Sequence, residues 1–187
     1  MIFDLPTAVE FGGRSWDIAT DYRDILRILT AFEDPDLEDV EKVMLCLYNL
    51  YVDFEDIPQD QLQAAYDAAM RFIDCGSESR EDGPRTMDWT QDAALIFPAV
   101  NRAAGFEVRS VDYLHWWTFL GLFMEIKDSV YSTVLGLRSK KSHGKKLEKW
   151  EKEYWAQNKR ICELRPRYTE EEQAEKRRLE KILGIGG

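Results

Sequence analysis

Cysteine and histidine are scarce in this 187-residue chain. The three cysteines, Cys46, Cys75 and Cys162, are odd in number and form no Cys-x-x-Cys pair, which argues against a disulfide framework and against a zinc site. Because the only histidines are His115 and His143, a metal site would need carboxylates alone. The cysteine pattern therefore predicts a reducing compartment, with the cytoplasm as the default.

The motifs that mark common active sites are also missing. The chain has no phosphate-binding loop, no Gly-x-Gly-x-x-Gly, no His-Glu-x-x-His and no Gly-x-Ser-x-Gly. The group Asp53, Glu55 and Asp56 lacks the spacing and the glycine of a calcium loop, which favours a solvated turn. His115 lies in an aromatic segment, where a hydrogen-bonded histidine of the core or its boundary is favoured over a catalytic base. We therefore expect a protein that is not an enzyme and needs no metal and no cofactor.

Long hydrophobic runs are absent. The first 20 residues lack a positive segment followed by an apolar one, so no signal peptide is expected. The densest apolar run is shorter than the roughly 18 residues that a membrane-spanning helix needs. No membrane association is expected.

Charge of one sign dominates each half of the chain. Residues 1–100 carry 22 acidic and 7 basic side chains, whereas residues 101–187 carry 13 acidic and 18 basic ones, for a net charge of -10. The acidic half would repel nucleic acid and anionic membranes. It would suit a basic protein partner, although plain solubility is the favoured reading.

The densest apolar run, residues 113–126, is predicted to be the central helix. The spacing of its large side chains places most of them on one stripe, and apolar residues cover much of the remaining surface. A helix with so little polar surface is expected inside the protein. The predicted core residues are Leu114, Trp116, Trp117, Phe119, Phe123 and Ile126.

The remaining pattern predicts a mainly α protein (α+β), a multi-helix bundle with a small N-terminal β-hairpin or short antiparallel sheet. Apolar residues alternate around Gly12-Gly13, which is a hairpin signal. Thr169 and Glu172 have the spacing of a capping box at the start of the last helix. The other helices are expected at about 20–32, 37–52, 57–74, 88–104, 130–137 and 145–164.

The helix at 37–52 has a wide apolar face. Asp36 is expected to cap its start, with Asp39 favourable in the first turn. The predicted inward residues are Val40, Val43, Met44, Leu47, Tyr48 and Tyr51.

Composition divides the chain into four parts. Residues 1–76 form an N-terminal part with a hairpin and acidic helices. Residues 77–86 have no apolar side chain and are predicted to be a flexible linker. Residues 87–165 form an aromatic helical core with a long helix, and residues 166–187 form a charged C-terminal helix that is frayed or waits for a partner.

A basic run at 136–149 is the main candidate for binding. Six basic residues and one acid lie there, and aromatic residues follow at helical spacing. The run could be an ordinary exposed loop, a patch that attracts the acidic half of another copy, or a phosphate-binding segment, with the first favoured and the last least so. The candidate partner-binding residues are Lys140, Lys141, Lys145, Lys146, Trp150, Tyr154 and Trp155.

Several short motifs resemble a bacteriophage protein family. They are Trp89-Thr90-Gln91-Asp92-Ala93, Leu114-His115-Trp116-Trp117, Arg138-Ser139-Lys140-Lys141 and the start Phe3-Asp4-Leu5-Pro6. The resemblance covers most of the chain to about residue 165. The family is found beside the tape-measure gene in long-tailed phages and in prophages of Gram-positive bacteria.

The resemblance implies a tail assembly chaperone. Such a protein binds the helical tape-measure protein and keeps it soluble until tail-tube protein assembles around it. It would act in the cytoplasm of the bacterial host, without enzymatic activity, and would form a homo-oligomer. The alternatives are a minor structural protein that stays in the virion tail and, less favoured, a nucleic-acid-binding phage regulator.

Overall fold

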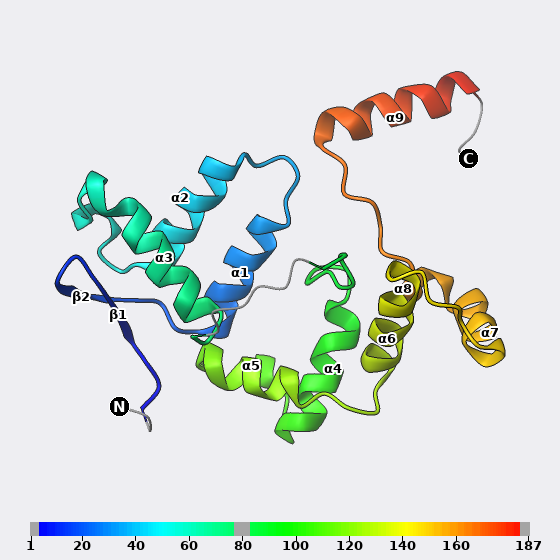
Figure 1. Ribbon diagram of the computed structural model, residues 1–187, viewed down its shortest axis with the longest axis horizontal. Helices are drawn as coiled ribbons and strands as arrows, with labels where there is room; N and C mark the ends of the chain where they lie inside the picture. Colours follow the sequence, from blue (N-terminus) through cyan, green and yellow to red (C-terminus); the bar gives the residue numbers. More distant parts are fainter. Residues whose placement is uncertain (1–3, 77–82, 184–187) are drawn as a thin grey trace.

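The computed structural model describes residues 4–76 and 83–183, with side chains described to residue 178. These residues form a mainly helical protein with a small antiparallel hairpin at the N-terminal end, which confirms the predicted fold class (Figure 1). The hairpin lies at one end of the long axis and α7 at the other.

The hairpin consists of β1, Ala8–Phe11, and β2, Arg14–Asp17. Gly12 and Gly13 connect the strands with φ of 59° and 74°, a left-handed conformation that favours glycine. Trp16 on β2 is buried, so the hairpin contributes to the core. A two-stranded sheet alone is at best marginally stable, and this one packs on α3.

Three helices form the N-terminal half: α1 (Tyr22–Phe32), α2 (Asp39–Leu50) and α3 (Leu62–Ile73). Two short 3-10 turns, η1 (Phe54–Asp56) and η2 (Gln59–Gln61), connect α2 to α3. The helices pack in sequence order, α1 on α2 and α2 on α3.

The start of α2 differs from the prediction. Glu38, not Asp36, is the N-cap, and it forms a capping box with Glu41. The box satisfies backbone N–H groups that have no partner inside the helix. Asp36 and Asp34 instead lie in the turn that precedes the helix, where the Asp34 carboxylate accepts a hydrogen bond from the Asp36 amide.

The inward side of α2 was predicted only in part. Leu47 and Tyr51 are buried and Val43 packs against the core, as predicted, whereas Val40, Met44 and Tyr48 are exposed. The apolar arc of this helix is wider than the surface that α1 and α3 cover. Periodicity identified the arc but not the part of it that packs.

The C-terminal half contains α4 (Ala93–Ala104), α5 (Trp116–Met124) and α6 (Val130–Ser142), with the 3-10 turn η3 (Val108–Ser110) between α4 and α5. Gly105 ends α4 in a left-handed conformation, which is common for the glycine that follows a helix.

Two tryptophans attach α5 to the end of α3. The indole nitrogens of Trp116 and Trp117 each donate a 2.8 Å hydrogen bond, to the carbonyls of Ile73 and Phe72 respectively. The last carbonyls of a helix have no partner within it, so these bonds satisfy α3 while they position α5.

The predicted central helix packs on one face only. Trp116 and Phe119 are buried. The other predicted core residues are half-buried against the same cluster; they are Leu114, Trp117, Phe123 and Ile126. Met124 on the opposite face is 73% exposed.

The long helix predicted at 145–164 is two shorter ones, α7 (Lys149–Gln157) and α8 (Lys159–Cys162). They are separated by Asn158, whose backbone and side-chain nitrogens both donate to the carbonyl of Tyr154. An asparagine that bonds its own preceding turn competes with helix continuation.

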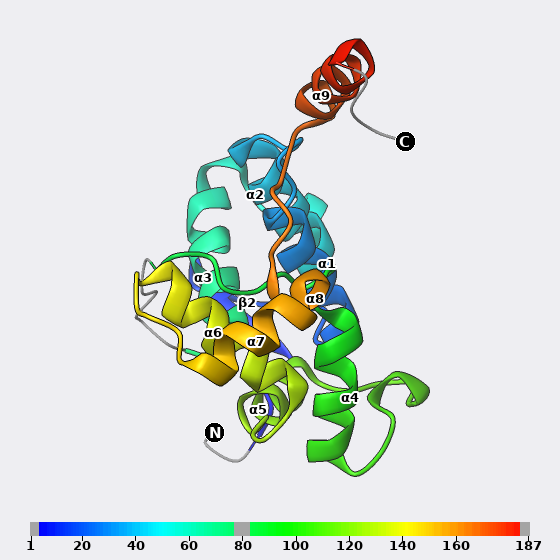
Figure 2. The same cartoon turned by 90° about the vertical axis from the view of Figure 1, so that its right-hand side faces the viewer.

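The last helix, α9 (Glu170–Leu183), starts with the predicted capping box. Thr169 Oγ1 accepts from the Glu172 amide at 3.1 Å, and Glu172 accepts from the Thr169 amide at 2.9 Å. Figures 1 and 2 show α9 standing apart from the other helices at the end of an extended segment.

One hydrophobic cluster includes residues from both sides of the predicted linker, such as Ile28 and Ile73 before it and Ile96 and Trp116 after it. The predicted boundary is thus not a boundary of the core. Residues 77–82 of the predicted linker lie outside the described residues, and the division of the chain into four parts stays a prediction.

Candidate protein-binding surfaces

His115 has a structural place at the start of α5. Its Nδ1 accepts a 3.0 Å hydrogen bond from the Trp117 amide, and its Nε2 lies 2.9 Å from the carbonyl of Pro6. Only the neutral ring with the proton on Nε2 makes both bonds. The ring therefore caps the helix and holds the segment before the hairpin.

The side chains that could bind a metal ion do not gather at one place in the described part of the chain. Within residues 4–76 and 83–183, no group of three His, Cys, Asp or Glu side chains could hold a metal ion. Asp53, Glu55 and Asp56 lie in and beside η1 at the surface, as expected for a solvated turn.

The predicted binding residues divide into two groups. Lys140 Nζ lies 2.5 Å from Glu151 Oε1, a carboxylate that is almost fully buried, and the Lys141 ammonium sits 4.0 Å above the Trp155 ring. These two lysines join α6 to α7. Lys145 and Lys146 lie in the connection between the helices and are exposed.

The three predicted aromatic residues divide in the same way. Trp150 is 53% exposed, and its indole nitrogen donates to Glu148. Tyr154 and Trp155 pack against a second hydrophobic cluster, which is formed by Val134, Leu137 and Cys162. Only Trp150 of the three is exposed to solvent.

Arg138, part of the basic run, is buried and forms an ion pair with Asp92. Its two terminal nitrogens lie 2.6 and 2.8 Å from the two carboxylate oxygens. The same guanidinium donates to the carbonyls of Thr86, Ile161 and Cys162. All five donors of the arginine are thus used, and α6 is tied to the start of α4 and the end of α8.

The sequence alone does not predict this role, because Arg138 lies in a basic run beside lysines. A signal was present: Arg138 follows Tyr131 by seven residues and Val134 by four, so all three share one helix face. The neighbouring Gln91 also contacts the exit of α8, where its side chain donates to the Glu163 carbonyl and accepts from the Arg165 amide.

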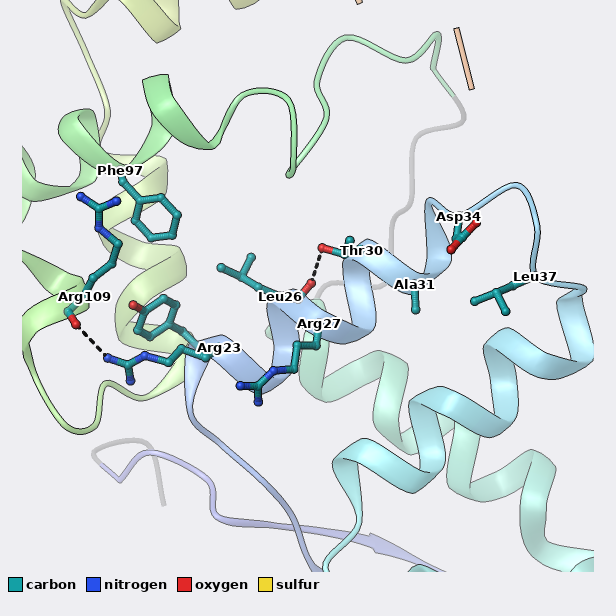
Figure 3. A pocket seen from close by; sticks show the side chains of 10 residues that line it. Arg23, Leu26, Arg27, Thr30, Ala31, Asp34, Leu37, Phe97 and Arg109 are labelled. Atoms are coloured by element: carbon teal, nitrogen blue, oxygen red, sulfur yellow. Dashed lines mark hydrogen bonds between the residues drawn. The ribbon is translucent and has the colours of Figure 1, made fainter. Parts of the chain in front are cut away.

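A groove of about 600 Å³ runs along α1 (Figure 3). Its apolar lining includes Tyr22 and Leu26 from α1 and Phe97 from α4. The turn after α1 continues the groove to Leu37. The groove is therefore open, mostly apolar and parallel to a helix.

Three arginines line the groove with their guanidinium groups. Each pairs with a carboxylate in its own segment, and the Arg109 guanidinium lowers the pKa of the Glu107 carboxyl to about 2. The rim is consequently balanced in charge and is not a site built for a free anion. The pairs are Arg23–Asp21, Arg27–Asp24 and Arg109–Glu107.

The groove is fixed in place by the start of α1. Asp21 caps α1 by accepting from the Arg23 amide at 2.9 Å, and its other oxygen accepts from the Leu114 amide at 3.1 Å. The ring of Tyr22 stacks on Phe119 with centroids 4.5 Å apart. One wall of the groove is thereby part of the rigid aromatic core.

The described part of the chain has no helix long and apolar enough to cross a membrane. In comparisons with known proteins, residues 1–164 match the family model described as Bacteriophage Gp15 protein. No curated protein matches the chain, and no solved structure matches it either. The match confirms the resemblance to a bacteriophage family and spans every element up to α8.

Proposed function

Because the chain belongs to the bacteriophage Gp15 protein family, we propose that it is a tail assembly chaperone. In this proposal it binds helical segments of the phage tape-measure protein and releases them to the tail-tube protein during assembly. It acts in the host cytoplasm by binding alone, without catalysis and without a cofactor.

The groove along α1 is the observation that supports the proposal. An amphipathic helix binds by placing its apolar face in an apolar groove, with anchors at helical spacing. The groove has an apolar lining from Tyr22, Leu26 and Phe97, and it is parallel to a helix. Covering that lining removes apolar surface from water, which contributes roughly 25 cal/mol per Å².

The arginines at the rim of the groove would favour a client helix that has acidic residues beside its apolar anchors. The Arg27 side chain is 67% exposed, so it can leave Asp24 for a carboxylate on a bound helix without a burial cost. Arginine is suited to such an exchange because its planar group bonds carboxylates in pairs. The preferred client segment would carry leucine-like anchors with acidic neighbours.

Co-expression with the tape-measure protein of the same phage tests the proposal. Thr30 is an exposed α1 residue that lines the groove, so Thr30→Trp should fill the groove without disturbing the core. We expect wild-type protein to co-purify with the client and raise its soluble fraction, and Thr30→Trp to lose most of both effects.

Thr30→Ala is the matched control, because it removes only the bond from the hydroxyl to the Leu26 carbonyl. It should behave as wild type. A client that is equally insoluble with and without the protein, or a Thr30→Trp variant that binds normally, would count against the proposal.

Mass spectrometry of purified virions distinguishes the chaperone from the alternative role. A chaperone should be absent from finished particles. Detection at a constant ratio to tail proteins would favour a minor structural protein of the virion.

A further inference from the structure

We propose that the protein associates with itself head to tail. The lysine-rich end of one copy, residues 140–152 with Trp150, would dock on the apolar, acid-rimmed face of α2 in the next copy. This inference concerns surfaces outside the groove on α1 and does not depend on the client.

The first surface is a stripe of exposed apolar side chains on and just after α2. Its members follow one another at intervals of four residues, which is the spacing of one helix face. Their exposed fractions are 71, 39, 67 and 67% in chain order. Contiguous exposed apolar residues mark interaction sites in soluble proteins. The members are Val40, Met44, Tyr48 and Val52.

Carboxylates are frequent in the segment that carries this stripe. Residues 36–60 contain eight acidic side chains and one lysine. In the last turn of α2, Tyr48 lies edge-on to Phe54 of η1, with ring centroids 6.0 Å apart. Next to this pair is a hollow of about 450 Å³ that is lined by Tyr48, Val52 and the acidic turn from Asp53 to Asp56. The hollow offers a place for an aromatic side chain within a negative rim.

The second surface has the complementary properties. Residues 139–152 contain six lysines and two glutamates. Five of the lysines are exposed, at positions 141, 145, 146, 149 and 152. Trp150 lies among them with 53% of its surface exposed. Tryptophan is among the residues that most often dominate the binding energy of an interface.

The two surfaces cannot meet within one chain. Figure 1 shows α2 in the half of the molecule that holds the hairpin and α7 at the other end of the long axis, with α4 and α6 between them. Pairing of two identical surfaces would place carboxylates against carboxylates, or lysines against lysines, which is unfavourable. The complementary pair therefore requires a second copy, and the contact is heterologous. Such contacts generate rings when they close and filaments when they do not.

The attraction between the surfaces should depend on salt. Charges at an exposed rim are screened over about 10 Å at 0.1 M salt and about 3 Å at 1 M. We expect sedimentation velocity to show oligomers at about 0.05 M salt, and the dissociation constant to rise more than about tenfold by about 0.5 M.

Two double variants, each with uncharged glutamine substitutions on one surface, test whether the contact runs head to tail. Met44→Gln with Tyr48→Gln disables the α2 face, and Lys145→Gln with Trp150→Gln disables the lysine-rich end. All four positions are exposed, so both variants should keep the thermal unfolding midpoint of the wild type. Each variant alone should be monomeric.

Mixed in equal amounts, the two variants should form a dimer and nothing larger, because one intact face then meets one intact end. Met124→Gln, at an exposed position on α5, should associate as wild type. A wild-type protein that is monomeric at low salt would overturn the proposal. So would a single variant that still dimerises alone, or a mixture that stays monomeric.

Discussion

The aromatic core and the ion-pair end of this protein are held together by different forces. The aromatic core, formed around Trp116, Phe119 and Tyr22, consists of stacked rings buried between α1, α4 and α5. The ion-pair end, formed by α6 to α8, has a small apolar cluster and depends on Arg138 and Asp92.

The difference shows how a small cluster can position three helices. Apolar burial is strong but not directional, and it tolerates shifts of packing partners. A guanidinium with five donors in fixed directions accepts one arrangement only. The arginine also accepts no other position for α8, because it donates hydrogen bonds to the carbonyls of Ile161 and Cys162 at the end of that helix. The ion pair thereby fixes where α7 and the lysine-rich end lie.

The largest expected effect is in the aromatic core. Trp116→Ala should lower the free energy of unfolding by about 3–5 kcal/mol, because it removes a buried indole and leaves a cavity. Chemical denaturation measures this change, with Met124→Ala on the exposed side of the same helix as the control. A loss below about 1 kcal/mol would mean that α5 does not anchor the core.

A somewhat smaller effect is expected at the ion-pair end. Asp92→Leu should cost about 3 kcal/mol, since it leaves the Arg138 charge buried without its partner. The double variant Asp92→Leu with Arg138→Met should cost less than the single one, because no buried charge remains. Denaturant unfolding of both variants measures this, and additive losses would contradict a direct pair.

The smallest effect is a dependence of the stability on pH, which involves Glu151 at the same end. The bond from Lys140 lowers the pKa of the Glu151 carboxyl below its ordinary value. A carboxylate with a lowered pKa in the folded state adds stability above its unfolded pKa of about 4.3, and this is lost as pH falls through the folded value.

Unfolding midpoints between pH 7 and about pH 3 measure this loss. Glu151→Gln should decrease the pH dependence, whereas Glu153→Gln, at an exposed position on the same helix, should not. Equal slopes for wild type and Glu151→Gln would show that the contact with Lys140 adds nothing to stability.

Local sequence signals predicted local structure well. The hairpin at Gly12-Gly13, the helix predicted at about 20–32 and the capping box of Thr169 all lie where the pattern placed them. Each depends on a few neighbouring residues, so a single segment contains the whole signal. One helix was predicted across Asn158 because the apolar stripe, interrupted at Gln157 or Asn158, resumes at Ile161.

Contacts between distant segments were not predictable in the same way. The apolar arc of α2 was visible, but periodicity does not say which third of a wide arc a neighbour covers. Arg138 was read as part of an exposed basic run, because its partner Asp92 is 46 residues away. The groove along α1 requires residues from α1 and α4, which no single segment contains.

The order of amino acids by itself determined that this chain is mainly helical, acidic in its first half and basic in its second, and without the motifs of common active sites. Only the tertiary structure decided which apolar residues remain uncovered on α2, and that one arginine of the basic run is locked inside. The physical reason is that propensity and capping act over a few residues, whereas burial and charge pairing depend on what distant segments bring together.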